Sequence, residues 1–334
     1  MLTHLKSPAP AARGLLLLTI PVTACAWSMA PALGQLPRTH ADSGTESHAR
    51  WHQAPTAHLE EDEVPTLIPP NAASDSWFAP WSHSHTSKSG TPFVHLFGLE
   101  PAFLDRDLFM DYRTINGLDE DETEVEVELE WALTNRLGVV FELPYVRLDP
   151  DGGDSSAGVG DWTIAPRALL IAADDYLLSA NLGITFPTGN EGEGLGSGEV
   201  SVSPSLSAWF DLGQWVQLSA QAGIERGRDS GDREAFYNGA LVYLFQAPGQ
   251  LGEHDHLHGD GRREHPRGLT SAILELSART GLNGPNDGRS RAELLFGISH
   301  NLAGAWDLRA GYQVALGGDR DLENAAVLSL VRHF

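Results

Sequence analysis

An alternation of apolar and acidic residues between Thr123 and Thr134 sets the pattern for most of the chain. Apolar residues occupy every second position with glutamates between them: Val125, Val127, Leu129, Trp131 and Leu133 alternate with Glu124, Glu126, Glu128 and Glu130. A period of two places the two sets on opposite faces of a β-strand, whereas a helix would spread both around its axis. The pattern predicts either a tilted membrane strand with lipid on one face or a half-exposed strand of a soluble sheet.

The same alternation recurs from Leu104 to Phe334, and its context favours the membrane strand. We predict about 12 strands, an even number as in bacterial outer-membrane barrels, at residues 105–114, 123–134, 137–148, 161–171, 176–186, 200–210, 215–225, 234–245, 269–280, 290–300, 305–316 and 322–334. The inward face of the strand at 234–245 is not decided by the pattern. Long and short connections alternate, apart from the segment 246–268. The expected fold is an all-β, antiparallel transmembrane barrel that closes because lipid tolerates no open edge.

Aromatic residues support the same fold. They gather beside the short turns, where one interfacial girdle is expected, at Trp131, Tyr176, Phe210, Trp215, Phe245 and Trp306. The chain ends on Phe334, and a terminal aromatic residue on an amphipathic strand resembles the signal that the outer-membrane assembly machinery recognises. The predicted partners therefore include outer-membrane lipid and that machinery.

The residues before the barrel divide into two further regions. Lys6 and Arg13 precede an apolar run, which predicts a secretory signal peptide over residues 1–34 with its cleavage site undecided. Val22-Thr23-Ala24-Cys25 also resembles a lipobox, so lipidation of Cys25 is an alternative. Residues 35–103 are rich in Pro, Ser, Thr and His without periodicity, and they are expected to form a mostly disordered periplasmic leader before the barrel at 104–334. The net charge of −23 argues against a nucleic-acid partner.

Charged residues on the polar faces of the strands are the candidate lining of the lumen: Glu124, Glu126, Glu128, Glu130, Glu142, Arg167, Glu275, Arg279, Arg291, Glu293 and Arg309. They either form a polar lumen that selects or binds a solute, or pair across a narrow interior and fill it. Ser299 and His300 are neighbours on opposite faces of one strand, so their side chains diverge. No nucleophile motif accompanies them, and we predict no catalytic residues and no enzyme.

The segment 246–268 is the one candidate for metal binding. Its histidines alternate with carboxylates, at His254, His256 and His258, followed by His265. Imidazoles and carboxylates are good ligands for zinc, copper or nickel. The alternative is a polar loop that is merely rich in histidine, because the spacing is not that of a structural zinc site. Apart from this divalent metal, no cofactor is predicted.

Four short motifs occur in order at strand boundaries: Glu142-Leu143-Pro144-Tyr145, Gly158-Val159-Gly160-Asp161, Pro187-Thr188-Gly189 and Ser203-Pro204-Ser205-Leu206. In this order the chain resembles the outer-membrane barrel family named for the MetA pathway of phenol degradation. The resemblance implies a channel or transporter for a small solute, aromatic or hydrophobic compounds among them, in the bacterial outer membrane. The alternatives are a metal-associated outer-membrane protein, through the His-rich periplasmic segments, and a closed structural barrel.

Overall fold

A computed structural model describes residues 77–81, 85–87, 91–213, 215–245, 268–302 and 305–334. The chain divides into two units, 1–60 and 61–334, and all the described residues belong to the second. Within these ranges no helix is both long enough and apolar enough to span a membrane. The predicted signal peptide with Cys25, most of the leader, and the metal candidates His254, His256, His258 and His265 lie outside the described residues.

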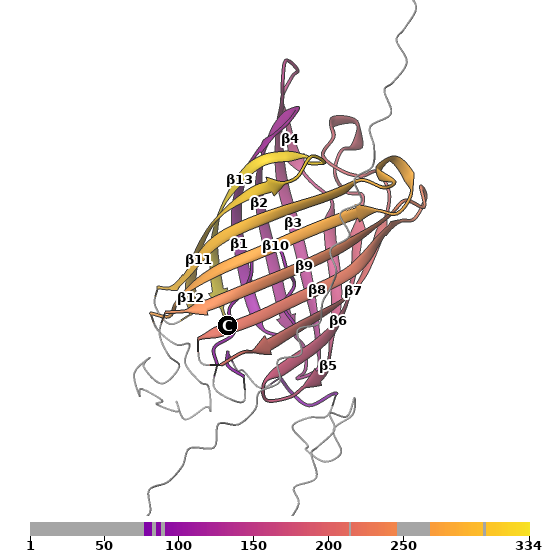
Figure 1. Cartoon of the computed structure of the whole chain (residues 1–334). Coiled ribbons are helices and arrows are strands. Elements are labelled where there is room, and N and C mark those ends of the chain that lie inside the picture. Colours follow the sequence, from indigo (N-terminus) through magenta and orange to yellow (C-terminus); the bar gives the residue numbers. More distant parts are fainter. Residues whose placement is uncertain (1–76, 82–84, 88–90, 214, 246–267, 303–304) are drawn as a thin grey trace, which may run out of the picture. The chain divides into compact units, whose positions relative to one another are not determined.

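The described strands form one antiparallel sheet that closes into a barrel (Figure 1). β1 pairs with β13 and β2 pairs with β3, so the ring has no free edge. The strands of the ring are β1 (Arg106–Gly117), β2 (Glu120–Ala132), β3 (Leu137–Pro150), β5 (Trp162–Ala172), β6 (Tyr176–Phe186), β7 (Ser201–Asp211), β8 (Val216–Gly227), β9 (Arg233–Leu244), β10 (Thr270–Gly281), β11 (Ser290–Asn301), β12 (Trp306–Leu316) and β13 (Leu322–His333). The short β4 (Ser156–Val159) pairs only with β3, in the loop that follows it. The predicted closed barrel of 12 strands is confirmed.

The first hairpin is longer than the sequence predicted. We expected strands at 105–114 and 123–134, but β1 continues to Gly117 and β2 starts at Glu120. Asn116 and Asp121 are still paired across the ladder, so only residues 118–119 connect the two strands. Backbone pairing does not require apolar side chains, so polar residues can extend a ladder beyond the lipid, where water solvates them. This tight connection is an exception to the expected alternation of long and short loops.

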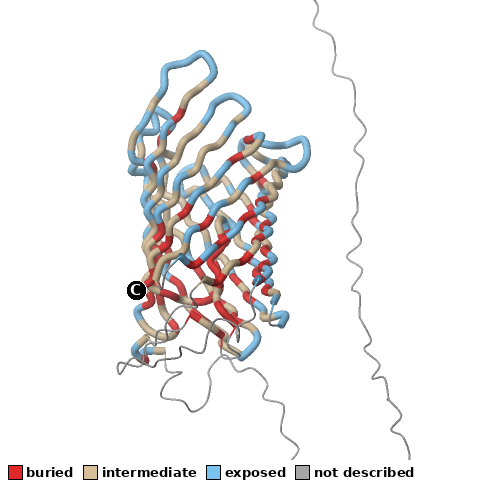
Figure 2. The backbone as a smooth tube through the Cα atoms, turned by 90° about the vertical axis from the view of Figure 1, so that its left-hand side faces the viewer, coloured by how far each residue is buried: buried red, intermediate tan, exposed pale blue. Residues whose placement is uncertain are grey.

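The two ends of the barrel differ. The connections at 133–136 and 173–175, with residues 212–213, 215, 302 and 305, lie at the end that carries the C-terminus, which we call the turn end. The connections at 151–161, 187–200, 228–232, 282–289 and 317–321 lie at the opposite end, which we call the loop end. Buried residues concentrate toward the turn end, and exposed residues toward the loop end (Figure 2). This distribution indicates that the interior near the turn end is filled.

The outer face of the barrel is apolar. Large hydrophobic side chains are exposed from the first strand to the last, among them Met110, Val125, Phe141, Leu182, Leu206, Leu218, Tyr237, Leu274, Phe296, Tyr312 and Leu328. At the turn end Trp131 lies 6.1 Å from Phe334 between ring centroids, and Arg332 stacks over both Trp306 and Phe334. Such a belt with an aromatic girdle is stable against lipid and costly against water. The barrel therefore spans a membrane through its strands.

Candidate functional site: the plugged lumen

Residues 91–103, at the end of the expected leader, lie within the lumen near the turn end, and we call them the plug. Side chains from strands around the ring hold its backbone. Glu275 of β10 accepts hydrogen bonds from the N–H groups of Phe97 (2.6 Å) and Gly98 (3.0 Å). Arg309 of β12 donates to the carbonyl of Leu96 at 2.5 Å, and Gln217 of β8 donates to that of Pro92 at 2.5 Å. A buried segment outside any ladder needs such partners, because its own peptide groups would otherwise stay unpaired.

Apolar packing explains why β9 could not be oriented from sequence. Its inward residues Ala240, Val242 and Leu244 are buried in one cluster with Leu96 and Leu99 of the plug. Lipid covers one face of β9 and the plug covers part of the other, so both faces are apolar there. A second cluster joins the far end of the plug to β5, β6 and β7: Ala102, Phe103, Leu169, Leu177 and Trp209. The plug therefore has an apolar contact on two sides of the barrel.

Two glycines of the wall make room for the ring of Phe97. Gly297 of β11 and Gly311 of β12 are directly paired across the ladder. A Cβ atom at Gly297 would collide with the Phe97 ring, and one at Gly311 would contact it. The guanidinium of Arg309 lies over the same ring, 5.1 Å from its centroid. The close approach of ring and backbone fixes the position of the plug along the lumen.

Arg167 of β5 is a second buried arginine that anchors the plug. Its side chain is 2% exposed, and it forms ion pairs with Glu100 (2.8 Å) and Glu130 (3.2 Å). It also donates to the carbonyl of Phe103 at 3.1 Å and to that of Pro101. Buried charges persist only when paired and hydrogen-bonded. Arg167 thus joins two elements, the plug and β2, through one guanidinium group.

Between the plug and the loop end the lumen contains a series of cavities. One of ≈ 330 Å³ lies directly on the plug, against Phe97 and Glu124. A second of ≈ 370 Å³ extends beside the plug along Glu128 and Glu142, and two more of ≈ 420 and ≈ 530 Å³ lie toward the loop end. Arg279 of β10 borders all four cavities. It is therefore the residue at which these spaces meet.

Acidic side chains gather on one side of the lumen. Glu124, Glu126, Glu128 and Glu142 lie on β2 and β3, and Glu128 directly faces Glu142 across the ladder. Among the described residues, none of these four forms an ion pair. Like charges opposite each other in a sheet repel. The result is an acidic wall, which faces the arginines of β10 to β12 across the lumen.

The arginines that the sequence placed in the lumen bind carboxylates other than those of the acidic wall. Arg279 pairs with Glu225 (3.1 Å) and Glu234 (3.2 Å), and Arg291 pairs with Glu234 (2.5 Å) and Asp321. The guanidinium of Arg309 lies 3.6 Å from the carboxylate of Asp111. The two remaining predicted glutamates also have other partners: Glu275 binds the plug, and Glu293 accepts a hydrogen bond from Gln313. Of the predicted lumen residues, only Glu130 and Arg167 form an ion pair with each other in the described part of the chain.

Several lining residues were not singled out from the sequence. Asp111 and Arg113 lie inward on β1 and line the cavity on the plug, and Arg113 donates to Gln313 at 2.7 Å. The alternation of apolar and polar residues along β1 could have identified both. Glu100 could not have been found in this way, because it belongs to the plug, which has no periodicity.

The two residues considered for an enzyme are separated as the sequence predicted. Ser299 is buried on the inner face of β11, and His300 is exposed on its outer face. The hydroxyl of Thr270 lies 2.8 Å from Nδ1 of His300, on the same outer face. The two side chains therefore diverge and do not form a nucleophile and base pair.

Loops at the other end are tied together by two carboxylates. Asp161 accepts hydrogen bonds from the backbone N–H groups of Gly189 (2.9 Å) and Ser197 (2.7 Å), and Glu199 accepts from those of Asp229 (2.7 Å) and Ser230 (2.9 Å). Burial works to raise the pKa of Asp161, but the hydrogen bonds outweigh it and hold that pKa below its usual range. Hydrogen bonds from Ser230 and Asp229 lower the pKa of Glu199. Both groups border the cavity nearest the loops.

Acidification is expected to loosen the loop 187–200. A carboxylate whose pKa is lowered by folding stabilises the folded loop fully above its ordinary pKa, about 4, and loses that contribution as the pH falls through the folded value. A spin label at Glu193→Cys should therefore become more mobile below about pH 4. In the double variant Asp161→Asn, Glu199→Gln the label should be mobile at neutral pH as well. A label that is equally immobile in both proteins at all pH values would contradict this role.

Comparison with known proteins agrees with the fold. Residues 120–255 match the model of the family described as "Putative MetA-pathway of phenol degradation". The crystal structure of the COG4313 outer membrane channel from Pseudomonas putida F1 is similar over 72% of this chain and 100% of that chain, with 16% identity and a TM-score of 0.53. The NanC porin (12% identity, TM-score 0.43, 69% of this chain and 99% of that chain) and the KdgM porin in complex with disordered oligogalacturonate (10%, 0.44, 68% and 99%) are more distant. No curated protein matches by sequence at a significant level.

The family match confirms over these residues the resemblance seen in the four sequence motifs. A closed barrel of this size with an apolar belt is the architecture of bacterial outer-membrane proteins, and the Pseudomonas channel has that fold. The predicted localisation in the bacterial outer membrane is confirmed.

Proposed function

We propose that this chain, whose residues 120–255 match the MetA-pathway family, is an outer-membrane channel for small solutes in which the plug restricts passage near the turn end. The observation that carries the proposal is the series of cavities that share Arg279. An interior that only filled the barrel would have its charges paired across it. Here the acidic wall borders open space, and the arginines opposite bind other carboxylates.

The lining of these cavities supports a preference for cations. Fixed carboxylates in a confined space raise the local concentration of positive charge. Phe97 adds an apolar surface at the base of the cavity on the plug. We therefore expect small solutes, aromatic or hydrophobic ones among them, with cations passing more readily than anions. The short turns should face the periplasm and the long loops the exterior, as in other barrels of this class.

Replacing Glu126 and Glu128 by glutamine is expected to lower the cation preference of the channel. The two carboxyl groups lie on the acidic wall and form no ion pair among the described residues, so their replacement removes acidic groups that no arginine of the wall neutralises. The measurement is the reversal potential of single channels in planar bilayers under a salt gradient. Glu323→Gln, an exposed carboxylate at the loop end, is the matched control and should leave the reversal potential unchanged.

A closed structural barrel is the second candidate, and the plug is the observation that favours it. A closed structural barrel would show no conductance in the wild type, and none in a variant that lacks the plug. That pair of results would refute the proposed channel. Binding of a divalent metal by His254, His256, His258 and His265 lies outside the described residues and stays a prediction, as does recognition of Phe334 by the assembly machinery.

A further inference from the structure

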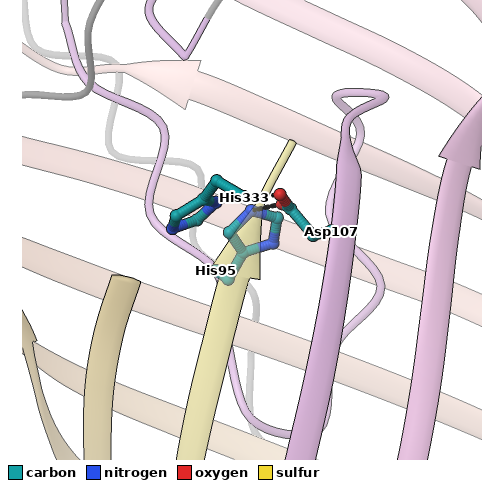
Figure 3. Close-up of side chains that lie close together, drawn as sticks. All are labelled: His95, Asp107 and His333. Carbon is teal, nitrogen blue, oxygen red and sulfur yellow. Dashed lines mark hydrogen bonds and ion pairs between the residues drawn. The ribbon is translucent and has the colours of Figure 1, made fainter. Parts of the chain in front are cut away.

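Buried histidines and an aspartate meet where the plug contacts the seam between the first and last strands. His95 comes from the plug, Asp107 from β1 and His333 from β13, and Figure 3 shows their side chains converging. Their exposures are 5%, 0% and 4%. Each side chain offers one ligand atom, and these atoms lie within 4.8 Å of one another. Asp107 and His333 are also direct partners in the β1–β13 ladder, so the barrel closure itself holds two of the three groups together.

Both imidazoles are arranged in the same way around Asp107. Nδ1 of His333 lies 2.8 Å from Oδ1 of Asp107, and its Nε2 lies 3.3 Å from Oδ2 of Asp307. Nε2 of His95 lies 2.6 Å from Oδ2 of Asp107, and its Nδ1 lies 4.0 Å from Oε1 of Glu130. Each ring thus directs one nitrogen to the centre and the other to an outer carboxylate. Metal-binding histidines are commonly oriented by such an outer carboxylate.

The contact between His95 and Asp107 is not an ordinary hydrogen bond. Among the described residues, neither Oδ2 of Asp107 nor Nδ1 of His95 has a hydrogen-bond partner of normal geometry, although both atoms are buried. Buried polar atoms that lack well-aligned hydrogen bonds are costly. The carboxylates of Asp107 and Asp307 lie against the two imidazoles, and such groups favour a cation at the centre of the cluster.

We propose that His95, Asp107 and His333 bind a divalent transition-metal ion that fastens the plug to the barrel wall. Two imidazoles and one carboxylate suit zinc, which takes such ligands at about 2.0–2.2 Å and leaves a fourth position for water. Tetrahedral binding at those lengths separates ligand atoms by about 3.4 Å, so the three side chains need only small adjustments. Because one ligand belongs to the plug and two belong to the seam, bound metal stabilises the plugged form by mass action.

The test uses the full chain in detergent, titrated with Co²⁺ and followed by its visible d–d absorption, and with Zn²⁺ by calorimetry. The four alanine substitutions His254→Ala, His256→Ala, His258→Ala and His265→Ala remove the histidines of the segment 246–268. In this background one site with the spectrum of bound Co²⁺ should remain. Adding His95→Gln should abolish that spectrum and weaken binding at least about 10-fold. Adding His300→Ala instead, a histidine on the outer face of β11, should change neither.

Two results would overturn the proposal: no Co²⁺ spectrum in the background with the four alanine substitutions, or the same spectrum and affinity after His95→Gln. The second result would leave the direct contacts between these histidines and carboxylates as the fastening. His95 is outside the strand ladder, so the variant should keep the heat-modifiable gel mobility of a folded barrel. His333→Gln provides a second variant from the wall side of the site. The assay does not depend on conduction, so its failure would leave the proposed channel function standing.

Discussion

Removal of the plug is expected to raise the single-channel conductance several-fold. The narrowest section of a pore limits its conductance, and residues 91–103 occupy the lumen with Leu96 and Phe103 buried against the wall on two sides. The strand ladders that close the barrel do not include the plug, so the wall should remain folded without it. The measurement compares the wild type with a variant that lacks residues 35–103.

A shorter deletion controls for loss of the leader as such. A variant that lacks only residues 35–76 keeps every described residue of the plug, and its conductance should stay close to that of the wild type. Both deletions should insert into bilayers equally well, because they share the same barrel. Equal conductance from the two deletion variants would show that the plug does not limit passage.

The substitution Arg167→Met is expected to destabilise the plugged barrel by about 3–5 kcal/mol, the usual cost of removing one partner of a buried ion pair. It leaves the carboxylate of Glu130, 3% exposed, without its cation, and it removes the donors to Pro101 and Phe103. The measurement is urea unfolding from lipid vesicles, followed by tryptophan fluorescence. Trp209 reports on the plug because it packs against Phe93, with ring centroids 5.2 Å apart.

Two further variants separate the buried charge from other effects. Arg147→Met removes an exposed arginine whose partner is Asp149, and it should change stability little, because such surface pairs contribute little. Adding Glu130→Gln to Arg167→Met should recover part of the loss, since the unpaired buried charge is then gone. A loss below about 1 kcal/mol for Arg167→Met would indicate that water replaces the guanidinium.

The local pattern of the sequence was sufficient to predict the barrel wall. Strand faces follow from a period of two, and lipid imposes that period on every strand because the outer face must be apolar. The inward positions of Glu126, Glu275 and Arg279 follow from the same rule. The position of the aromatic girdle beside the short turns could also be predicted from the local sequence, because it depends only on where each strand ends.

Only the tertiary structure decided what fills the lumen inside the barrel wall. The plug has no periodicity, and its contacts join residues far apart in the chain, such as Leu96 with Arg309 and His95 with Asp107. The partners of the arginines likewise depend on which strands become neighbours and on their register: Arg167 reaches Glu130 and the plug rather than the acidic wall. Periodicity determines which side of a strand faces inward, but it carries no information about which distant groups meet inside.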